Sequence, residues 1–224
     1  MERTQVRKIK STRLSVSGIY VFQGHTSIQF ESTLERDFLT RFEFEPNLLD
    51  IISQPCTIPF KHSNGRTYNY TPDFLVYYKL DDESYDEYPK PILVEVKPKK
   101  ILMKNWRKWS NKYKAAISYA KQEGLIFRLY DESRIHNQMF KNTKFLQRYE
   151  RMVFCSQESN SIINSVKDMS HTTISYLLAK HFSVKTKAEG LSLIWHLISI
   201  KVLSCDMNQV FNQLTTVWVS DSYE

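Results

Sequence analysis

Three charged residues stand in or beside two apolar runs of the chain. Asp73 precedes the run FLVYY (74–78), and Glu95 and Lys97 interrupt the run ILVEVKP (92–98). Two carboxylates and an ammonium group can bind a hard divalent cation and stabilise negative charge on a phosphate. Phosphodiester hydrolysis needs these parts, because a metal serves as Lewis acid, a water attacks in line and charge builds on the phosphoryl oxygens.

The two runs are predicted to be β-strands. Residues two apart along a strand point to the same face, so Glu95 and Lys97 project together with Leu93. If the strand that begins near Asp73 pairs beside this one, Asp73 lies on the same face. Two carboxylates that close repel each other unless a cation lies between them.

A structural interpretation of the same residues stays open. Glu95 and Lys97 can form a surface ion pair on a half-exposed strand, and Pro72-Asp73 can form a turn. A strand buried on both faces would disfavour this interpretation, because paired charges are costly to bury.

The elements expected around these strands form an α/β sheet domain. Apolar spacing predicts helices over residues 31–42 and about 102–122, and strands over 57–63, 67–78, 92–98 and 125–132. Strand, helix and strand in that order imply a right-handed crossover with parallel pairing. An acidic loop is expected before the third strand, and residues 134–154 are expected to continue the domain as helix.

A basic stretch over residues 97–114 holds eight Lys or Arg residues and no acid, with Trp106, Trp109 and Tyr113 between them. The chain carries a net charge of +7, whereas residues 165–224 are balanced. Such a stretch is typical of a protein that binds a polyanion. A solvated amphipathic helix with its aromatic residues in the core is the alternative, and both can hold if the lysines face outward.

The C-terminal part is predicted to be a separate module. Residues 155–165 are polar and are expected to form a linker, followed by two helices and a hairpin that suggest a winged-helix module over 165–224. Its second helix, 187–201, is mostly apolar, whereas a helix that enters the major groove should expose Arg, Lys, Asn or Gln. We therefore expect this module to bind protein.

Composition argues against several other classes. Only 5 Gly occur, with no phosphate-binding or dinucleotide fingerprint. Three widely spaced Cys and a charged N-terminus without an apolar leader predict a cytoplasmic protein. No apolar stretch is long enough for a membrane span, and the six His show no zinc-binding spacing.

Four segments in order resemble the TnsA family, the endonuclease subunits of heteromeric cut-and-paste transposons within the PD-(D/E)xK nuclease superfamily. They are ESTLERDFL (31–39), FEPNLLDIISQP (44–55), YTPDFLV (70–76) and VEVKP (94–98). The resemblance covers about residues 31–150. It implies a restriction-endonuclease-like mixed sheet over residues 1–154, with a basic N-terminal arm, and a smaller winged-helix-like C-terminal module.

The resemblance also implies the roles of the site residues. Asp73 and Glu95 would bind Mg²⁺ or Mn²⁺, and Lys97 would serve the attacking water. The helix glutamate of the family motif maps to Glu35. Glu31 on the same face is an alternative, and Ser32 with Glu35 also fits a purely structural capping box.

By the same resemblance, the chain is a bacterial Mg²⁺-dependent DNA endonuclease that cuts the 5′, non-transferred strands at transposon ends. Its partners would be transposon-end DNA, a DDE-type (TnsB-like) transposase and an AAA+ (TnsC-like) regulator. Phosphates beside the metal would be bound by basic residues, namely Lys99, Lys100, Lys104, Arg107 and Lys108. A stand-alone restriction- or resolvase-like nuclease and a non-catalytic DNA-binding assembly factor are the alternatives.

Overall fold

The computed structural model describes residues 4–6, 16–62, 64–79, 88–184, 186–220 and 223. The chain divides into two compact units, residues 1–136 and 137–224. The first seven residues of the predicted acidic loop (81–91) and most of the basic N-terminal arm lie outside the described residues. Within the described residues, no helix has the length and apolar character that a membrane crossing requires.

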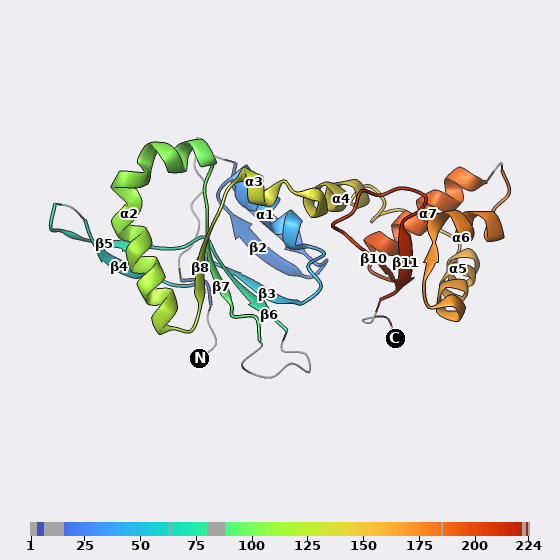
Figure 1. Ribbon diagram of the computed structural model, residues 1–224, viewed down its shortest axis with the longest axis horizontal. Helices are drawn as coiled ribbons and strands as arrows, with labels where there is room; N and C mark the ends of the chain where they lie inside the picture. Colours follow the sequence, from blue (N-terminus) through green and yellow to red (C-terminus); the bar gives the residue numbers. More distant parts are fainter. Residues whose placement is uncertain are drawn as a thin grey trace. The chain divides into compact units, whose positions relative to one another are not determined.

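The first unit is built on a four-stranded mixed sheet in the order β3-β6-β7-β8 (Figure 1). Its strands are β3 (Leu48–Ser53), β6 (Phe74–Tyr78), β7 (Ile92–Val96) and β8 (Ile126–Tyr130). β6 pairs antiparallel with β3 and with β7, and β7 pairs parallel with β8. The connection from β7 to β8 runs through α2 (Lys99–Gln122), so the predicted parallel crossover and α/β fold class are confirmed.

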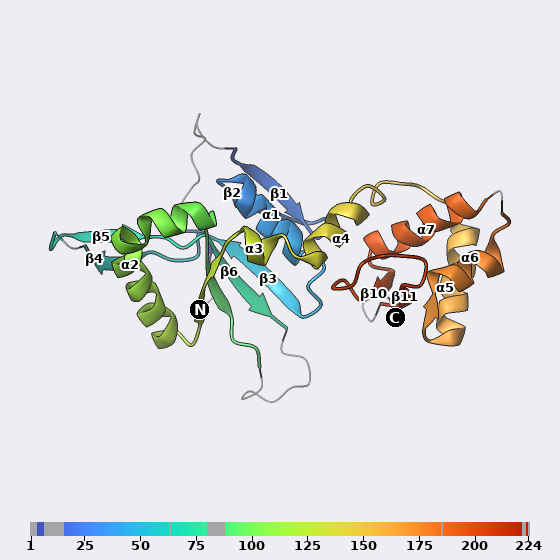
Figure 2. The same cartoon turned by 45° about the horizontal axis from the view of Figure 1, so that its top comes forward.

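Each face of this sheet packs against a helix and a β-hairpin (Figure 2). On one face, α1 (Thr33–Phe42) and the hairpin β1 (Gly18–Phe22)–β2 (Thr26–Phe30) form a core with the side chains of Val94 and Val96. On the other face, α2 and the hairpin β4 (Ile58–Lys61)–β5 (Thr67–Tyr70) pack on Leu75 and Leu93. A short helix, α3 (Glu132–Ile135), follows β8. Residues of β7 therefore alternate between two buried cores.

The strand predicted over residues 67–78 is two strands. It is interrupted at Thr71, Pro72 and Asp73, so that β5 pairs with β4 in a hairpin while β6 belongs to the central sheet. Proline explains the break, because it has no N–H to donate to a ladder. The hairpin β1–β2 and strand β3 were not predicted as elements.

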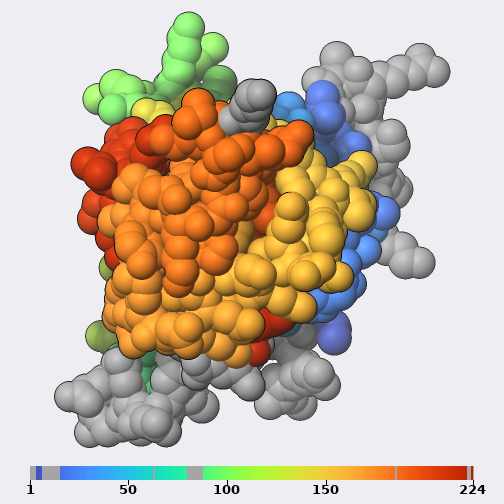
Figure 3. Space-filling view, turned by 90° about the vertical axis from the view of Figure 1, so that its right-hand side faces the viewer, coloured from blue at the N-terminus to red at the C-terminus, as the bar shows by residue number. Residues whose placement is uncertain are grey.

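The described residues of the second unit form four helices and a small three-stranded sheet in the order β10-β11-β9. The elements are α4 (Gln138–Leu146), α5 (Ser156–Met169), β9 (Thr172–Thr173), α6 (Ile174–His181), α7 (Lys187–Ser199), β10 (Leu203–Cys205) and β11 (Thr216–Val219). Figure 3 looks onto the surface formed mainly by the segment from α5 to α7, coloured yellow-orange to orange.

Two expectations about the domain border were wrong. The predicted linker is helix α5, whose Ile162, Ile163 and Val166 are buried although most of its remaining residues are polar. The segment 134–154 does not simply continue the first domain, because α4 belongs to the second unit. Asn142 of α4 donates from Nδ2 to the carbonyl oxygens of Met207 and Gln209, at 2.9 and 2.7 Å.

Candidate active site

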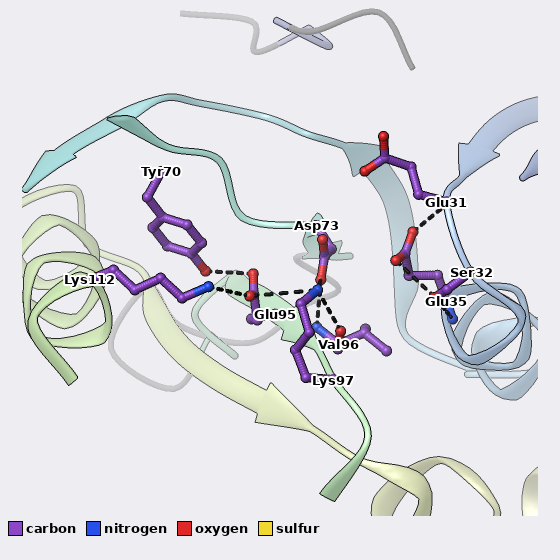
Figure 4. Close-up of polar contacts among 9 residues, drawn as sticks. All are labelled: Glu31, Ser32, Glu35, Tyr70, Asp73, Glu95, Val96, Lys97 and Lys112. Carbon is purple, nitrogen blue, oxygen red and sulfur yellow. Dashed lines mark hydrogen bonds and ion pairs between the residues drawn. The ribbon is translucent and has the colours of Figure 1, made fainter. Parts of the chain in front are cut away.

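Asp73, Glu95 and Lys97 meet where β6 pairs with β7 (Figure 4). Lys97 Nζ lies 3.1 Å from Asp73 Oδ2 and 3.6 Å from Glu95 Oε1. The amide of Asp73 donates to the carbonyl of Val94 at 2.9 Å, and the amide of Val96 donates to Asp73 Oδ2 at 2.7 Å. Strand pairing thus brings together the three residues that the sequence pattern selected.

The other side of Asp73 is held by β3. The amide of Gln54, the residue after β3, donates to the carbonyl of Asp73 at 2.8 Å. Gln54 is buried and has a left-handed backbone with φ of 48°. Because the backbone of Asp73 is bonded on both sides, the carboxylate is fixed to the framework of the sheet.

The burial of this cluster distinguishes it from an ion pair on the protein surface. All five residues of β7 are buried, and Glu95 is only 1% exposed. Side-chain exposure rises to 11% at Asp73 and 27% at Lys97, so the cluster is accessible to solvent on the side of Lys97. A half-exposed strand is therefore contradicted, and Glu95 needs compensating charge.

Two residues that the sequence analysis missed complete the contacts of Glu95. Tyr70 Oη at the end of β5 donates to Oε2 at 2.7 Å, and Lys112 Nζ from α2 donates to Oε1 at 2.8 Å (Figure 4). The ammonium of Lys112 also lies 4.6 to 4.8 Å from three aromatic ring centroids. Lys112 belongs to the basic stretch and precedes Tyr113, which helical spacing placed in the core. This position next to a core residue was the signal from which a role for Lys112 near the site could have been predicted.

The charges in the cluster shift the pKa values of its members. Burial, and then the negative charges of Glu95 and Glu35, raise the pKa of Asp73 well above its usual range. Burial opposes the charged form of Lys97, but the carboxylates of Asp73, Glu95 and Glu35 raise its pKa above the usual value. Lys97 is therefore an ammonium group in this arrangement and donates hydrogen bonds rather than accepting a proton.

Glu35 forms the capping box with Ser32 that the sequence offered as its structural role. The amide of Glu35 donates to Ser32 Oγ at 3.2 Å, and the Ser32 hydroxyl donates to Glu35 Oε1 at 2.9 Å. Glu35 Oε2 accepts from the amide of Glu31 at 2.7 Å. Burial raises the pKa of Glu35, and the positive charge of Lys97 opposes this shift, so Glu35 shares the electrostatic field of the cluster.

The donor set fits a single hard divalent cation. Mg²⁺ is commonly held by one or two carboxylates, with water and substrate phosphates completing its shell, and Asp73 and Glu95 supply two. The negative charge that raises the pKa of Asp73 is charge that a cation would offset. In the described parts of the chain, no group of three or more His, Cys, Asp or Glu side chains is arranged to hold a metal.

The predicted phosphate-binding residues form an exposed surface on α2, which we call the basic face. It consists of the exposed residues Lys99, Lys100, Lys104, Arg107 and Lys108. The aromatic residues of this helix were expected to be buried, but their exposure differs. Tyr113 is 3% exposed, whereas Trp106 is 51% exposed and packs one side of its ring near Tyr113, with the centroids 5.8 Å apart.

Two family models match consecutive parts of the chain. Residues 45–132 match the model described as TnsA-like endonuclease N terminal, and residues 134–207 match the model described as TnsA endonuclease C terminal. The first match contains Asp73, Glu95 and Lys97, while Glu35 precedes it. The junction of the two matches lies within a few residues of the border between the two units. No curated protein matches the chain.

Proposed function

Because the chain belongs to the TnsA family of transposon endonucleases, we propose that it is the metal-dependent nuclease subunit of a heteromeric transposase, cutting the 5′, non-transferred strands at transposon ends. The observation that carries the proposal is the cluster of Asp73, Glu95 and Lys97. Its ion-pair distances are 3.1 and 3.6 Å, and it lies within the segment that matches an endonuclease family.

The chemistry follows from the charges of the cluster. Asp73 and Glu95 would hold Mg²⁺ or Mn²⁺, which supplies Lewis acidity to the scissile phosphate when bound. Lys97 would donate hydrogen bonds to the attacking water and to a phosphoryl oxygen, because its raised pKa keeps it charged. The water oxygen bonds to phosphorus and the water gives up a proton to solvent, while the bond to the leaving oxygen breaks and that oxygen takes up a proton from solvent, so that protons balance over the step.

Glu35 is proposed as the helix glutamate of the site. Its burial and its electrostatic interaction with Lys97 support this assignment, although its oxygens also cap α1. A cap of this kind would hold the carboxylate in a defined position.

The basic face would hold the DNA backbone beside the cluster. Its five exposed charges begin two residues after Lys97 and lie within the first 10 residues of α2. Such contacts bind phosphates and position a duplex without specifying its sequence. Sequence recognition at transposon ends would then come from the DDE-type partner.

The second unit is proposed to be a winged-helix module that docks protein, either the DDE-type (TnsB-like) transposase or the AAA+ (TnsC-like) regulator. Its order of helices followed by a hairpin supports the winged-helix assignment. In α7, most residues after the first turn are buried, and the exposed residues are Lys187, Ala188 and Glu189. Such a helix has few polar groups to present to base edges. The cytoplasm is the proposed compartment, where the DNA is found.

The proposal is tested by mapping strand cleavage on end-labelled transposon-end DNA with Mg²⁺, with and without the co-encoded transposase. We expect partner-dependent cuts on the 5′ strands for the wild type and none for Asp73→Ala. Cutting without the partner would instead indicate a stand-alone nuclease. Equal, absent cutting by both proteins under all conditions would indicate a non-catalytic assembly factor.

A further inference from the structure

The hairpin β4–β5 projects from the body of the first unit past α2 (Figures 1 and 2). It forms a two-stranded sheet of its own, which pairs from Ile58 opposite Tyr70 at its base to Lys61 opposite Thr67 near its tip. Ile58 and Tyr70 are only 3% and 6% exposed, whereas every residue from 64 to 69 is exposed. The base of the hairpin therefore belongs to the core, and its outer half extends into solvent.

The exposed side chains of this hairpin are of types that bind nucleic acid. Residues 55–72 contain no Asp or Glu. Because opposite residues of an antiparallel pair share a face, Lys61, Thr67 and Asn69 lie together on the face that points away from the buried base residues. The side chains of Lys61, Arg66 and Asn69 make no hydrogen bond or ion pair with any residue that the structure describes. This polar surface is complementary in charge to a polyanion.

The form of the hairpin matches the major groove of DNA. Paired strands lie about 4.8 Å apart, and the major groove, about 12 Å wide, admits a two-stranded β-ribbon. The minor groove is only about 6 Å wide. Arginine pairs with O6 and N7 of guanine through two hydrogen bonds, and asparagine pairs in the same way with N6 and N7 of adenine. Arg66 and Asn69 supply both groups, one just before β5 and one within it.

The hairpin is tied directly to the carboxylate cluster. Tyr70 at the end of β5 donates to Glu95 Oε2 at 2.7 Å, and β4 packs against α2, which carries the basic face. A strand rises about 3.3 Å per residue, so Arg66 lies roughly 13 Å along the strand from Tyr70. That length corresponds to about four base pairs at about 3.4 Å each. Base pairs that the hairpin contacts would therefore lie close to the phosphate at the cluster.

We propose that the hairpin β4–β5 enters the major groove of the duplex beside the cut, where Arg66 and Asn69 contact base edges and Lys61 binds a backbone phosphate. The inference rests on the proposed nuclease function. The partner transposase would select the transposon end, and the hairpin would add contacts to the few base pairs next to the cut. Because Tyr70 couples the hairpin to Glu95, these contacts would help to set which phosphate reaches the cluster.

Replacement of single purines by their 7-deaza analogues tests the inference, because the analogue lacks the N7 acceptor in the major groove but pairs normally. Transposon-end duplexes would carry one replacement at each purine within a few base pairs of the cut. Fluorescence anisotropy measures their binding to the full chain alone, and strand mapping measures cleavage with the transposase. We expect at least one replacement to weaken binding by the wild type about fivefold or more, as the loss of a good base contact does.

Variants of the hairpin identify the contacting residue. Arg66→Ala or Asn69→Ala should bind the natural and the replaced duplex equally, because the deleted contact is already absent. Lys61→Ala should weaken binding to all duplexes alike. Lys121→Ala and Asn208→Ala are the matched controls, since they change exposed residues elsewhere, and both should retain the penalty of the replacement. Circular dichroism establishes that each variant folds.

The outcomes separate this inference from the nuclease function. If the wild type cuts natural DNA but no replacement weakens its binding, or the penalty is equal in the wild type and both base-contact variants, the groove contact is overturned alone. Folded hairpin variants that bind DNA normally but lose the transposase in a pull-down would also overturn it, and would assign the hairpin to a protein partner. A wild type that neither binds nor cuts natural DNA would overturn the nuclease function, and the inference with it.

Discussion

The hydroxyl of Tyr70 donates a 2.7 Å hydrogen bond to Glu95, and this bond joins two separate sheets of the first unit. Both residues are buried, with exposures of 6% and 1%. A phenylalanine at position 70 would keep the ring but leave a carboxylate oxygen without this donor.

We therefore expect Tyr70→Phe to lower the free energy of unfolding by about 1–3 kcal/mol, the usual cost of an unsatisfied buried polar group. Urea unfolding in EDTA measures the change. Tyr68→Phe is the control, because Tyr68 lies on the same strand, is 44% exposed and should change stability by no more than about 0.5 kcal/mol. Equal losses in the two variants would contradict a specific role for the bond to Glu95.

Asp73→Asn should have opposite effects on stability with and without metal. Burial and the neighbouring carboxylates disfavour the charged form of Asp73, while asparagine can still accept from the amide of Val96. In EDTA at neutral pH we expect the variant to be more stable than the wild type, on the order of 1 kcal/mol. Mg²⁺ should raise the melting temperature of the wild type but not of the variant. Thermal unfolding checks both, and a variant that is stabilised by Mg²⁺ as much as the wild type would exclude Asp73 as a ligand.

Conservative variants can separate the catalytic role proposed for Glu35 from its observed capping role. Glutamine also serves in a capping box, so Glu35→Gln should unfold within about 0.5 kcal/mol of the wild type but lose cleavage by a factor of about 100 or more. Ser32→Ala should cost about 1 kcal/mol and retain cleavage. Glu31→Gln keeps the backbone amide that bonds to Glu35, and it should cleave within a few-fold of the wild type. If cleavage instead survives in Glu35→Gln and is lost in Glu31→Gln, the helix carboxylate is Glu31.

Salt dependence tests the phosphate contacts that are proposed for the basic face. Each of Lys104→Gln, Arg107→Gln and Lys108→Gln should lower the slope of log affinity against log salt concentration by about 1, because one phosphate contact is lost. Lys121→Gln removes the same charge at the other end of α2 and should leave the slope unchanged. Fluorescence anisotropy on a labelled duplex gives these slopes, and a uniform change in all four variants would indicate only a net-charge effect.

The border after His136 determines where the chain can be divided. A fragment of residues 1–136 should fold and bind Mn²⁺, but it should lose binding to the transposase and the regulator. Circular dichroism, calorimetry and pull-down measure these three properties. A fragment that still binds both partners would contradict docking through the second unit.

Deletion of residues 165–224 follows the module border expected from the sequence. The remaining protein should fold less well than the fragment of residues 1–136. The deletion cuts through α5 and removes α7, against which α4 packs. The remaining α4 would expose Met139 and Leu146, which are buried in the full chain, so we expect aggregation rather than an intact core.

The strand pattern predicted the cluster of Asp73, Glu95 and Lys97 because its geometry is local. A period of two places Glu95 and Lys97 on one side of β7, and the 3.6 Å distance between their charged atoms confirms it. Contacts that depend on how elements pack could not be obtained in this way. Tyr70 reaches Glu95 from a different sheet, and Lys112 does so from the middle of a helix.

The domain border was missed for a different reason. Helix α5 has a polar composition, and its apolar residues Ile162, Ile163 and Val166 are few, although their spacing fits one face of a helix. Trp106 was assigned to the core from the same periodicity, yet it lies at the edge of the buried stripe and is half exposed. Sequence periodicity identifies the apolar face of a helix, and the element that packs against that face determines how many of its residues are buried.

If Asp73 is catalytic, as proposed, the bonds that hold it also determine when in folding the enzyme can become active. Its backbone and carboxylate are bound by Gln54, Val94 and Val96, which lie 19 to 23 residues away along the chain. These partners come together only when β3, β6 and β7 have paired, and non-local pairing is among the slower events of folding. A chain still emerging from the ribosome, or one that has lost this sheet, holds the same residues but no arranged site. With the catalytic role proposed for Asp73, newly made protein would thus be inert toward the DNA of its own cell until the sheet is complete.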